Sequence, residues 1–304
     1  MTFSDFIQSK KANPWKIGNE TISASRMPLV MGIVNVTPDS FFDGGKHNSP
    51  ADAFEHAINL LEHGADILDI GGESSRQGST PVSEQEELDR VCPVVESLAQ
   101  FTKIAETSGN NPYHFFISID TVKSKVAEEC MRLGAHIVND ISACTMDPDM
   151  LKVVAKTGAS VVLNHMRGNF GTMQQDFKPY TDVIVEVCDE LLIQAKKLEA
   201  AGVDPQKICI DPGIGFGKTA LDNIKLMKSI DSLSTKGYPV LIGTSRKSYI
   251  GAISGLEKSD RLIPTVSAGV IATLQGASVL RVHDVREAKE SILYLEALRS
   301  YGTV

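Results

Sequence analysis

Residues 115–140 read FFISIDTVKSKVAEECMRLGAHIVND, and this stretch decides the fold. Its two ends, 115–120 and 136–140, are short runs rich in β-branched and aromatic residues, which predict strands. Between them, the apolar spacing over 122–133 predicts a helix, and Gly134 stands where a glycine commonly follows the last helical turn. A strand, a helix and a second strand in this order predict two parallel strands joined by a helical crossover.

The same alternation continues along the rest of the chain. Further strands are predicted at 29–35, 66–70, 160–164, 207–211, 240–243 and 278–281. Further helices are predicted near 50–63, 83–101, 148–157, 181–201, 219–230, 260–276 and 284–300. Eight strands alternating with eight helices predict an α/β protein with a (β/α)8 TIM barrel, and a doubly wound open sheet is the competing architecture.

The chain is predicted to form one barrel domain with a short N-terminal extension. Residues 1–28, with a possible strand or hairpin near 16–23, are expected to close the bottom of the barrel, and residues 29–304 to form the barrel itself. Residues 262–280 carry no charge and are long enough to cross a membrane. Because Pro264, Thr265 and Gln275 interrupt this segment, a buried helix running into a buried strand explains it better.

Composition excludes several classes of protein. The 304 residues carry 30 basic and 38 acidic side chains, a formal net charge of −8, which argues against a nucleic-acid-binding protein. The five cysteines are scattered without a C-x-x-C pair, which indicates reduced thiols and a cytoplasmic protein. The first residues, MTFSDFIQSKK, have the wrong order of charges for a signal peptide, so neither export nor membrane attachment is expected.

Polar side chains stand at the carboxyl end of almost every predicted strand. They are Asn35, Asp69, Asp120, Asn139, Asp140, Asn164, His165, Asp211, Ser245, Arg246, Lys247, Arg281, His283 and Asp284. A single aspartate after a strand is commonly a helix N-cap, but so many strands ending in this way are hard to explain by capping alone. Because the carboxyl ends of barrel strands meet at one mouth, we expect the active site there.

The segment IDPGIGFGK (210–218) resembles two nucleotide-binding motifs and fits neither. A P-loop would need glycine where Pro212 stands, and the spacing of a third glycine for a dinucleotide-binding motif is absent. Its glycines are expected to let the backbone approach a flat ligand, with a merely tight turn as the alternative. The seven histidines show no metal-ligand spacing, so no structural zinc site is expected.

Residue types at the mouth suggest a ligand with a ring and an anionic group. The acids Asp120 and Asp211 can accept N–H bonds from an amino-pyrimidinone edge, and the amide of Asn139 suits an edge of mixed donors and acceptors. A cationic set suits phosphate oxygens, namely Arg76, Lys247, Arg281 and His283. Simple ion pairing among these residues is the alternative.

Read together, the segments at the mouth resemble the dihydropteroate synthase family of folate biosynthesis. The matching stretches are MGIVNVTPDSFFDGG (31–45), DILDIGGESSRQG (66–78), SIDT (118–121), IVNDIS (137–142), NHMRG (164–168), IDPGIGFGK (210–218), GTSRK (243–247) and RVHDV (281–285). The resemblance implies a homodimeric, sulfonamide-sensitive transferase that requires Mg²⁺. It would condense 6-hydroxymethyl-7,8-dihydropterin diphosphate with 4-aminobenzoate to give 7,8-dihydropteroate and pyrophosphate.

The resemblance also implies a role for each matching residue. Pterin binding would fall to Asp120, Asn139, Met166, Asp211, Phe216, Lys247 and Arg281. Asn35, Arg281 and His283 would hold the diphosphate, with Asn35 as the Mg²⁺ ligand. Two loops, 36–47 and 72–82, would complete the 4-aminobenzoate site with Thr37, Pro38, Phe41, Ser75, Arg76, Gln77 and Ser245. Ser75 and Gln77 stand where the family usually has Thr and Pro, so the fine shape of this pocket is expected to differ.

Asp120, Lys247, Arg281 and His283 are the expected catalytic residues. Acids around the ring and cations around the diphosphate predict that the C–O bond breaks before the amine attacks, through a pterin methyl cation. Three other classes remain open: a corrinoid-linked, pterin-binding methyltransferase domain, a non-catalytic pterin-binding paralogue, and a barrel acting on another phosphorylated metabolite. The two loop motifs and the Arg-x-His pair favour the synthase.

Overall fold

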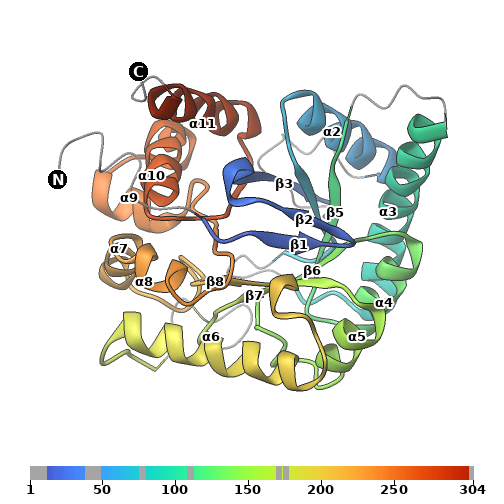
Figure 1. The fold of residues 1–304 in the computed structure, drawn as a ribbon, viewed down its shortest axis with the longest axis horizontal. Helices are drawn as coiled ribbons and strands as arrows, with labels where there is room; N and C mark the ends of the chain where they lie inside the picture. Colours follow the sequence, from blue (N-terminus) through green and yellow to red (C-terminus); the bar gives the residue numbers. More distant parts are fainter. Residues whose placement is uncertain are drawn as a thin grey trace.

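Parallel pairing links eight strands into one sheet that curves around a common centre (Figure 1). The computed structural model describes residues 12–37, 49–74, 80–107, 113–168, 173 and 178–300. The barrel strands are β3 (Leu29–Asn35), β4 (Ile67–Gly71), β5 (Phe116–Asp120), β6 (Ile137–Asp140), β7 (Ser160–Asn164), β8 (Ile208–Asp211), β9 (Leu241–Ile242) and β10 (Val279–Val282).

The two edges of this sheet meet. The strand order is β8-β7-β6-β5-β4-β3-β10-β9, and a parallel bridge joins Ile210 of β8 to Val240, the residue before β9. The sheet is therefore a nearly closed barrel, as the sequence predicts, and the doubly wound open sheet is wrong because its edges would stay apart.

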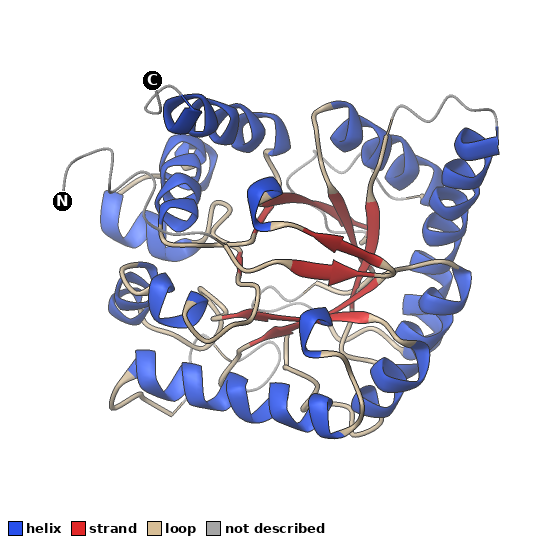
Figure 2. Cartoon of the chain, in the orientation of Figure 1, coloured by secondary structure: helices blue, strands red, loops and turns tan. Residues whose placement is uncertain are grey.

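Helices surround the strands on all sides (Figure 2). They are α2 (Pro50–Glu62), α3 (Glu84–Thr107), α4 (Ser124–Leu133), α5 (Met150–Thr157), α6 (Val183–Ala200), α7 (Ala220–Met227), α8 (Ile230–Ser234), α9 (Ser248–Ser254), α10 (Leu262–Leu274) and α11 (Val285–Ser300). Short 3-10 turns occur at η1 (Ala24–Arg26), η2 (Pro205–Lys207) and η3 (Lys258–Asp260).

Local sequence explains where several helices begin and end. Ser49 and Asp52 form a reciprocal capping box at the start of α2, and Gly134 ends α4 with a φ of 119°. At the start of α3 only half of a capping box forms. Ser83 Oγ accepts from the backbone N–H of Glu86 at 3.2 Å, but the carboxylate of Glu86 pairs with Arg90 instead.

Two helices differ from the sequence prediction. The helix expected at 219–230 is divided into α7 and α8, because Ser229 leaves the helical region with a φ of −132°. The seven-residue helix α9 was not predicted, and it follows directly on Lys247, whose backbone is extended. Residues 262–280 form α10 and β10 as expected, and no helix in the described part of the chain could span a membrane.

Side-chain alternation along the strands creates two apolar cores. Val30, Val34 and Leu68 belong to the outer core between the barrel and its helices. The inner core fills the bottom of the barrel with inward-facing residues of the strands, namely Leu29, Met31, Ile67, Phe116, Ile137, Val162, Cys209, Leu241 and Val279. Cys209 is fully buried there and packs in the inner core.

An antiparallel hairpin, β1 (Trp15–Ile17) and β2 (Glu20–Ile22), crosses the bottom of the barrel (Figure 1). Trp15, Ile17 and Ile22 are fully buried against the inner core. Trp15 Nε1 also donates to the carbonyl of Lys207 at 3.1 Å. The hairpin therefore fills the end of the barrel opposite the carboxyl ends of the strands.

Candidate active site

Above the apolar layer, the inward-facing positions become polar. Two residues after Ile67 comes Asp69, two residues after Phe116 comes Ser118, and two residues after Val279 comes Arg281. Because successive side chains in a strand point to opposite faces, these residues face the same interior as the apolar layer below them. The upper part of the barrel is therefore a polar mouth at the carboxyl ends of the strands, as the sequence predicts.

Asp69 is the centre of the polar network in this mouth. Its carboxylate accepts hydrogen bonds from Ser118 Oγ at 2.6 Å, from Asn139 Nδ2 at 3.0 Å and from Arg281 Nε at 2.6 Å. Arg281 Nη2 also donates to Asp120 Oδ2 at 2.6 Å. Asp69 stands at a predicted strand end, but no role was predicted for it. Its inward position two residues after Ile67 is the signal that could have identified it.

Burial and pairing shift the ionisation of this network. Burial raises the pKa of Asp120 to about 7, although the Arg281 guanidinium opposes the shift and Asp69 adds to it. Burial disfavours the charge of Arg281, yet the carboxylates of Asp69 and Asp120 outweigh burial and raise the pKa of its guanidinium. Arg281 thus stays charged, whereas Asp120 titrates near neutral pH.

Asp211 and Lys247 occupy the other side of the mouth. Asp211 is 3% exposed, and its Oδ1 accepts from the backbone N–H of Gly213 at 2.7 Å. Burial raises the pKa of Asp211, with Lys247 opposing the shift, and burial lowers the pKa of Lys247 to about 8. Lys247 Nζ donates to the carbonyl of Ile214 and lies 4.2 Å from the centroid of the Phe216 ring.

Ser245 and His283 form a further pair at the mouth. Ser245 Oγ accepts from the backbone N–H of His283 at 3.2 Å and lies 2.9 Å from His283 Nδ1. Arg246 also lines the cavity at the mouth, and it makes two hydrogen bonds to Asp284, at 2.8 and 2.7 Å. All three residues of the segment 245–247 therefore line the mouth, and Arg246 also anchors the segment to the start of α11.

A cavity of about 370 Å³ opens at this mouth, and it collects most of the described site residues. Those expected from the sequence are Asn35, Thr37, Asp120, Phe216, Ser245, Lys247, Arg281 and His283. Glu73, Lys258 and Arg261 line it as well and were not predicted. Asn139, Met166 and Asp211 are not among the lining residues, and Asn139 and Asp211 are buried. Pro38, Phe41, Ser75, Arg76 and Gln77 lie outside the described residues.

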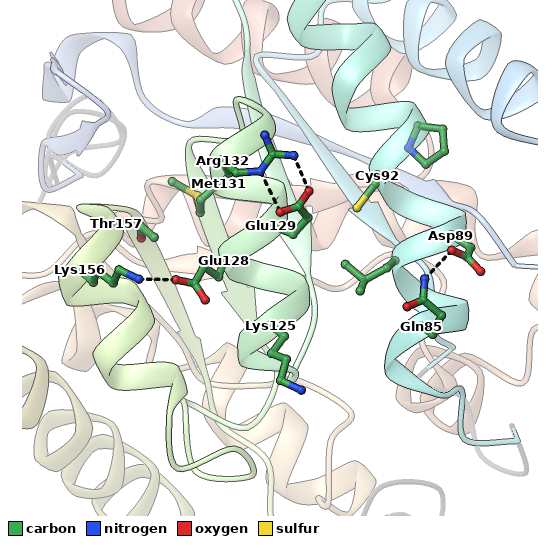
Figure 3. A pocket seen from close by; sticks show the side chains of 12 residues that line it. Gln85, Asp89, Cys92, Lys125, Glu128, Glu129, Met131, Arg132, Lys156 and Thr157 are labelled. Carbon is green, nitrogen blue, oxygen red and sulfur yellow. Dashed lines mark hydrogen bonds and ion pairs between the residues drawn. The ribbon is translucent and has the colours of Figure 1, made fainter.

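A larger hollow of about 980 Å³ lies between α3, α4 and α5, away from the strand ends (Figure 3). The charged side chains around it pair with one another, as in Lys156–Glu128 at 2.7 Å and Arg132–Glu129 at 2.5 Å. These pairs are solvent-exposed and each is satisfied within the groove. No strand end contributes to it, so the barrel mouth is the better candidate for an active site.

Asn35 offers the cavity a side-chain oxygen that suits a hard cation, and the two carboxylates that also line the cavity, Glu73 and Asp120, pair with Lys123 and Arg281. Among the described residues, no group of three or more His, Cys, Asp and Glu side chains could hold a metal ion. Mg²⁺ commonly binds few protein oxygens and takes its other ligands from water and substrate phosphates. The half-buried amide of Asn35 at the cavity wall fits a Mg²⁺ ion held chiefly by a bound diphosphate.

Comparison with known proteins identifies the family. Residues 31–283 match the family described as pterin binding enzyme. Dihydropteroate synthase from Escherichia coli (strain K12) is 44% identical over 273 residues, which cover 90% of this chain and 92% of that protein. Yersinia pestis dihydropteroate synthase, solved with a sulfonamide drug, has a TM-score of 0.85 at 42% identity, covering 94% and 99% of the two chains. Xanthomonas albilineans dihydropteroate synthase with 4-aminobenzoic acid has a TM-score of 0.83 at 38% identity, covering 96% and 99%.

The barrel and its mouth thus define an enzyme of the pterin-binding class. Within that class, the extent of the similarity shows that the chain belongs to the dihydropteroate synthase family of transferases. The resemblance stated from the sequence is confirmed, and the comparisons favour the synthase over a corrinoid-linked methyltransferase domain or a non-catalytic paralogue.

Proposed function

We propose that the barrel mouth condenses 6-hydroxymethyl-7,8-dihydropterin diphosphate with 4-aminobenzoate, giving 7,8-dihydropteroate and pyrophosphate. The observation that carries the proposal is the meeting of two residue sets at one mouth. Buried acids and an amide suit a donor-rich ring, and Lys247, Arg281 and His283 suit a diphosphate. No other described part of the chain combines these two sets at the carboxyl ends of barrel strands.

Asp211, Asn139 and Lys247 would recognise the pterin ring. Asp211 would accept from the 2-amino group and the ring N3–H. Its carboxylate has about four acceptor sites on two oxygens, and the backbone N–H of Gly213 takes one of those on Oδ1. The NH₂ of Asn139 donates to Asp69, which leaves its amide oxygen as an acceptor for the opposite ring edge. Lys247 would donate to the ring carbonyl and N5, and Phe216 and Met166 would line the ring pocket.

Arg281, His283 and Asn35 would hold the diphosphate. Arg281 is fixed by two acids and stays charged, so it can face the anion without rearrangement. Asn35 would bind Mg²⁺ together with substrate oxygens, and the ion, when bound, would neutralise charge on the leaving pyrophosphate. Ser245 would contribute to the 4-aminobenzoate site, together with Thr37 at the cavity wall.

We further propose that the C–O bond breaks before the amine attacks. Asp120 lies at the cavity wall with 29% of its side chain exposed, where it would face the positive charge that develops on the pterin. Arg281, bound to the same carboxylate, would draw the departing anion away from that charge. The amine nitrogen then forms the new C–N bond and releases a proton to solvent or to the pyrophosphate.

The homodimer and the cytoplasmic location are parts of the same proposal. Helices α10 and α11 carry exposed apolar side chains, namely Ile263, Ile271, Leu293, Tyr294 and Leu298, and α10 has no charged residue. Such a concentration of apolar side chains favours pairing with a second copy of the chain. The five cysteines are free thiols, which agrees with a reducing compartment.

An assay of pyrophosphate release tests the proposed function. The purified protein, Mg²⁺, the diphosphate substrate and 4-aminobenzoate should yield pyrophosphate and 7,8-dihydropteroate in equal amounts. A sulfonamide should inhibit this reaction, and excess 4-aminobenzoate should relieve the inhibition. Pyrophosphate release that is independent of 4-aminobenzoate, or inhibition that 4-aminobenzoate cannot relieve, would contradict the shared pocket.

A further inference from the structure

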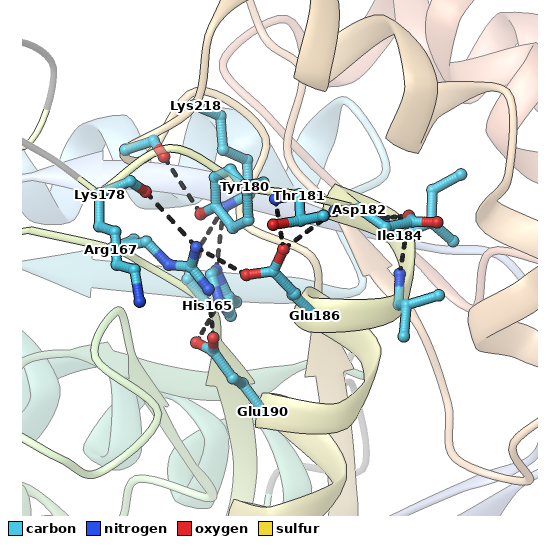
Figure 4. Close-up of polar contacts among 12 residues, drawn as sticks. His165, Arg167, Lys178, Tyr180, Thr181, Asp182, Ile184, Glu186, Glu190 and Lys218 are labelled. Atoms are coloured by element: carbon cyan, nitrogen blue, oxygen red, sulfur yellow. Dashed lines mark hydrogen bonds and ion pairs between the residues drawn. The ribbon is translucent and has the colours of Figure 1, made fainter.

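A cluster of polar residues lies beside the mouth and has no part in the proposed chemistry. It joins the loop after β7, the loop after β8 and the helix α6 (Figure 4). We call it the Lys218 cluster, and its members are Lys218, His165, Glu190, Arg167 and Tyr180.

Lys218 is the buried centre of this cluster. It is 4% exposed, and its amino group lies 3.0 Å from His165 Nδ1, 3.1 Å from the carbonyl of His165 and 3.0 Å from the carbonyl of Phe216. In the ammonium form each of its three N–H groups therefore has an acceptor. Two of these acceptors belong to the loop after β7 and one to the loop after β8, so Lys218 ties the loops together.

The cluster continues outward to the surface of α6. His165 is 3% exposed, and its Nε2 lies 2.9 Å from the carboxylate of Glu190. With Nδ1 accepting from Lys218, Nε2–H donates to Glu190, so a neutral imidazole links the buried amine to a carboxylate. Glu190 also pairs with Arg167, and the Arg167 guanidinium stacks 3.8 Å from the centroid of the Tyr180 ring.

Backbone contacts show how closely the two loops pack. A Cβ atom on Gly213 would lie 1.8 Å from the carbonyl oxygen of His165, and one on Gly217 would lie 1.9 Å from that of Arg167. Both glycines have positive φ, 65° and 62°. Tyr180 adds a hydrogen bond from its hydroxyl to the carbonyl of Gly217 at 3.1 Å. Only glycine permits this approach, so the relative position of the loops is tightly set.

The same loops carry the two residues assigned to the ring pocket. Met166 stands between His165 and Arg167, and Phe216 is two residues before Lys218, which holds its carbonyl. The Phe216 side chain lines the cavity and lies against Lys247. The backbone of each wall residue is thus held by the Lys218 cluster.

We propose that Lys218 is a positioning residue of the pterin pocket, which joins the loops after β7 and β8 so that Met166 and Phe216 flank the bound ring. The inference rests on the proposed function, because it takes the ring pocket to be a pterin site. Lys218 does not touch the substrate, and it acts through Phe216. Replacing Lys218 should therefore weaken pterin binding only when the Phe216 side chain is present to flank the ring.

A double-mutant cycle tests this mode of action. Calorimetry with 6-hydroxymethylpterin is carried out on the full chain, Lys218→Met, Phe216→Leu and the double variant. We expect Lys218→Met to weaken binding about tenfold, and by less than about twofold when Phe216→Leu is already present. An additive effect, or no effect of Lys218→Met in either background, would overturn the inference. Lys152→Met, which removes an 81% exposed lysine paired with Asp149, is the matched control and should bind as the parent does.

Two further results separate the inference from other causes. Thermal unfolding shows whether Lys218→Met is folded. If that variant is not folded, Glu190→Gln replaces it in the cycle, because this substitution weakens the outer end of the cluster at a half-exposed position. We then expect Glu190→Gln to weaken pterin binding about threefold, and to have no effect when Phe216→Leu is already present. Additive effects of the two substitutions would overturn the inference. A parent protein that does not bind the pterin would overturn the proposed function as well, whereas parent binding with equal affinity in all variants overturns the positioning role alone.

Discussion

Arg281 and Asp69 form an ion pair across the barrel interior, with Arg281 Nε 2.6 Å from Asp69 Oδ2, although 212 positions separate them in the chain. Asp69 is fully buried and also accepts from Asn139 and Ser118. The Asp69 carboxylate thus orients Arg281, which is assigned to the diphosphate, and Asn139, which is assigned to the pterin ring. The two halves of the substrate would be held by side chains with a common anchor.

Asp69→Asn should disable the enzyme although Asp69 is not expected to touch the substrate. The amide would place a donor group among three donors, and breaking one partner of a buried ion pair costs on the order of 3–5 kcal/mol. We expect kcat/KM to fall about 100-fold or more, with a lower Tm. Steady-state kinetics and thermal unfolding measure both. Ser118→Ala removes one neutral hydrogen bond, so its kcat/KM should fall by less than about tenfold. Parent-like kinetics in Asp69→Asn would refute the anchoring role.

Asp211→Asn should weaken pterin binding more than Asn139→Ala. The new amide would present a donor to the donors of the ring and leave a buried group unpaired, at a cost of about 1–3 kcal/mol. Asn139→Ala removes one acceptor and leaves Asp69 with its other two partners. Calorimetry with a pterin measures the difference, with Asp149→Asn at an exposed surface pair as the control. Equal affinity in Asp211→Asn and the parent would remove Asp211 from ring recognition.

The sequence was sufficient to predict the barrel because its signal is local and repeated. The strands Leu29–Asn35 and Ser160–Asn164 have the bounds that their apolar runs predict. β9 is only Leu241–Ile242, shorter than the expected 240–243, because pairing with neighbours on both sides decides its ends. The division of α7 from α8 at Ser229 depends on a single backbone conformation, which periodicity does not reveal.

The site was predictable in its residue types but not in its pairings. Each strand shows that Asp69, Asp120 or Arg281 stands near its carboxyl end. Only the pairing of β10 with β3, however, places Arg281 within hydrogen-bond distance of Asp69 on β4 and Asp120 on β5. Lys218 was considered only as part of a P-loop pattern, because lysine is rarely buried and its sequence position gives no sign of burial. His165 was identified only as a polar residue at a strand end, and it is 3% exposed within the Lys218 cluster.

The pH profile of kcat/KM should have an acid limb set by Asp120 and a basic limb set by Lys247. Burial raises the pKa of Asp120 to about 7, so its carboxylate forms, and kcat/KM rises, as pH increases through that value. Burial lowers the pKa of Lys247 to about 8, so its ammonium group, and with it activity, is lost above that value. A pH profile of kcat/KM for the pterin substrate measures both limbs. Asp120→Asn should abolish the acid limb and keep the basic one, and an unchanged acid limb would assign it to another group.

Charges on α10 should separate the proposed dimer. Ile263 and Ile271 are 77% and 50% exposed, and burying one isoleucine side chain contributes about 1.5–3 kcal/mol. We therefore expect Ile263→Glu with Ile271→Glu to raise the dimer dissociation constant at least about 100-fold. Light scattering should give two chains for the parent and one for the double variant. Ile193→Glu on α6, 54% exposed, is the matched control and should remain dimeric. A single-chain parent at micromolar concentration would contradict the dimer.

The order of bond breaking can be tested without the second substrate. If the C–O bond breaks first, the pterin methyl cation and pyrophosphate coexist at the mouth, stabilised by Asp120 on one side and by Arg281 and His283 on the other. Pyrophosphate can then rotate and recombine. A heavy-oxygen label placed in the bridging position of the substrate should move into the non-bridging positions in the presence of enzyme and Mg²⁺ alone. Asp120→Asn should slow this exchange and the complete reaction by similar factors, because both need the same developing charge to be stabilised. A bridging label that stays in place while the complete reaction turns over normally, or a covalent pterin–protein adduct, would instead favour direct displacement by the amine or a protein nucleophile.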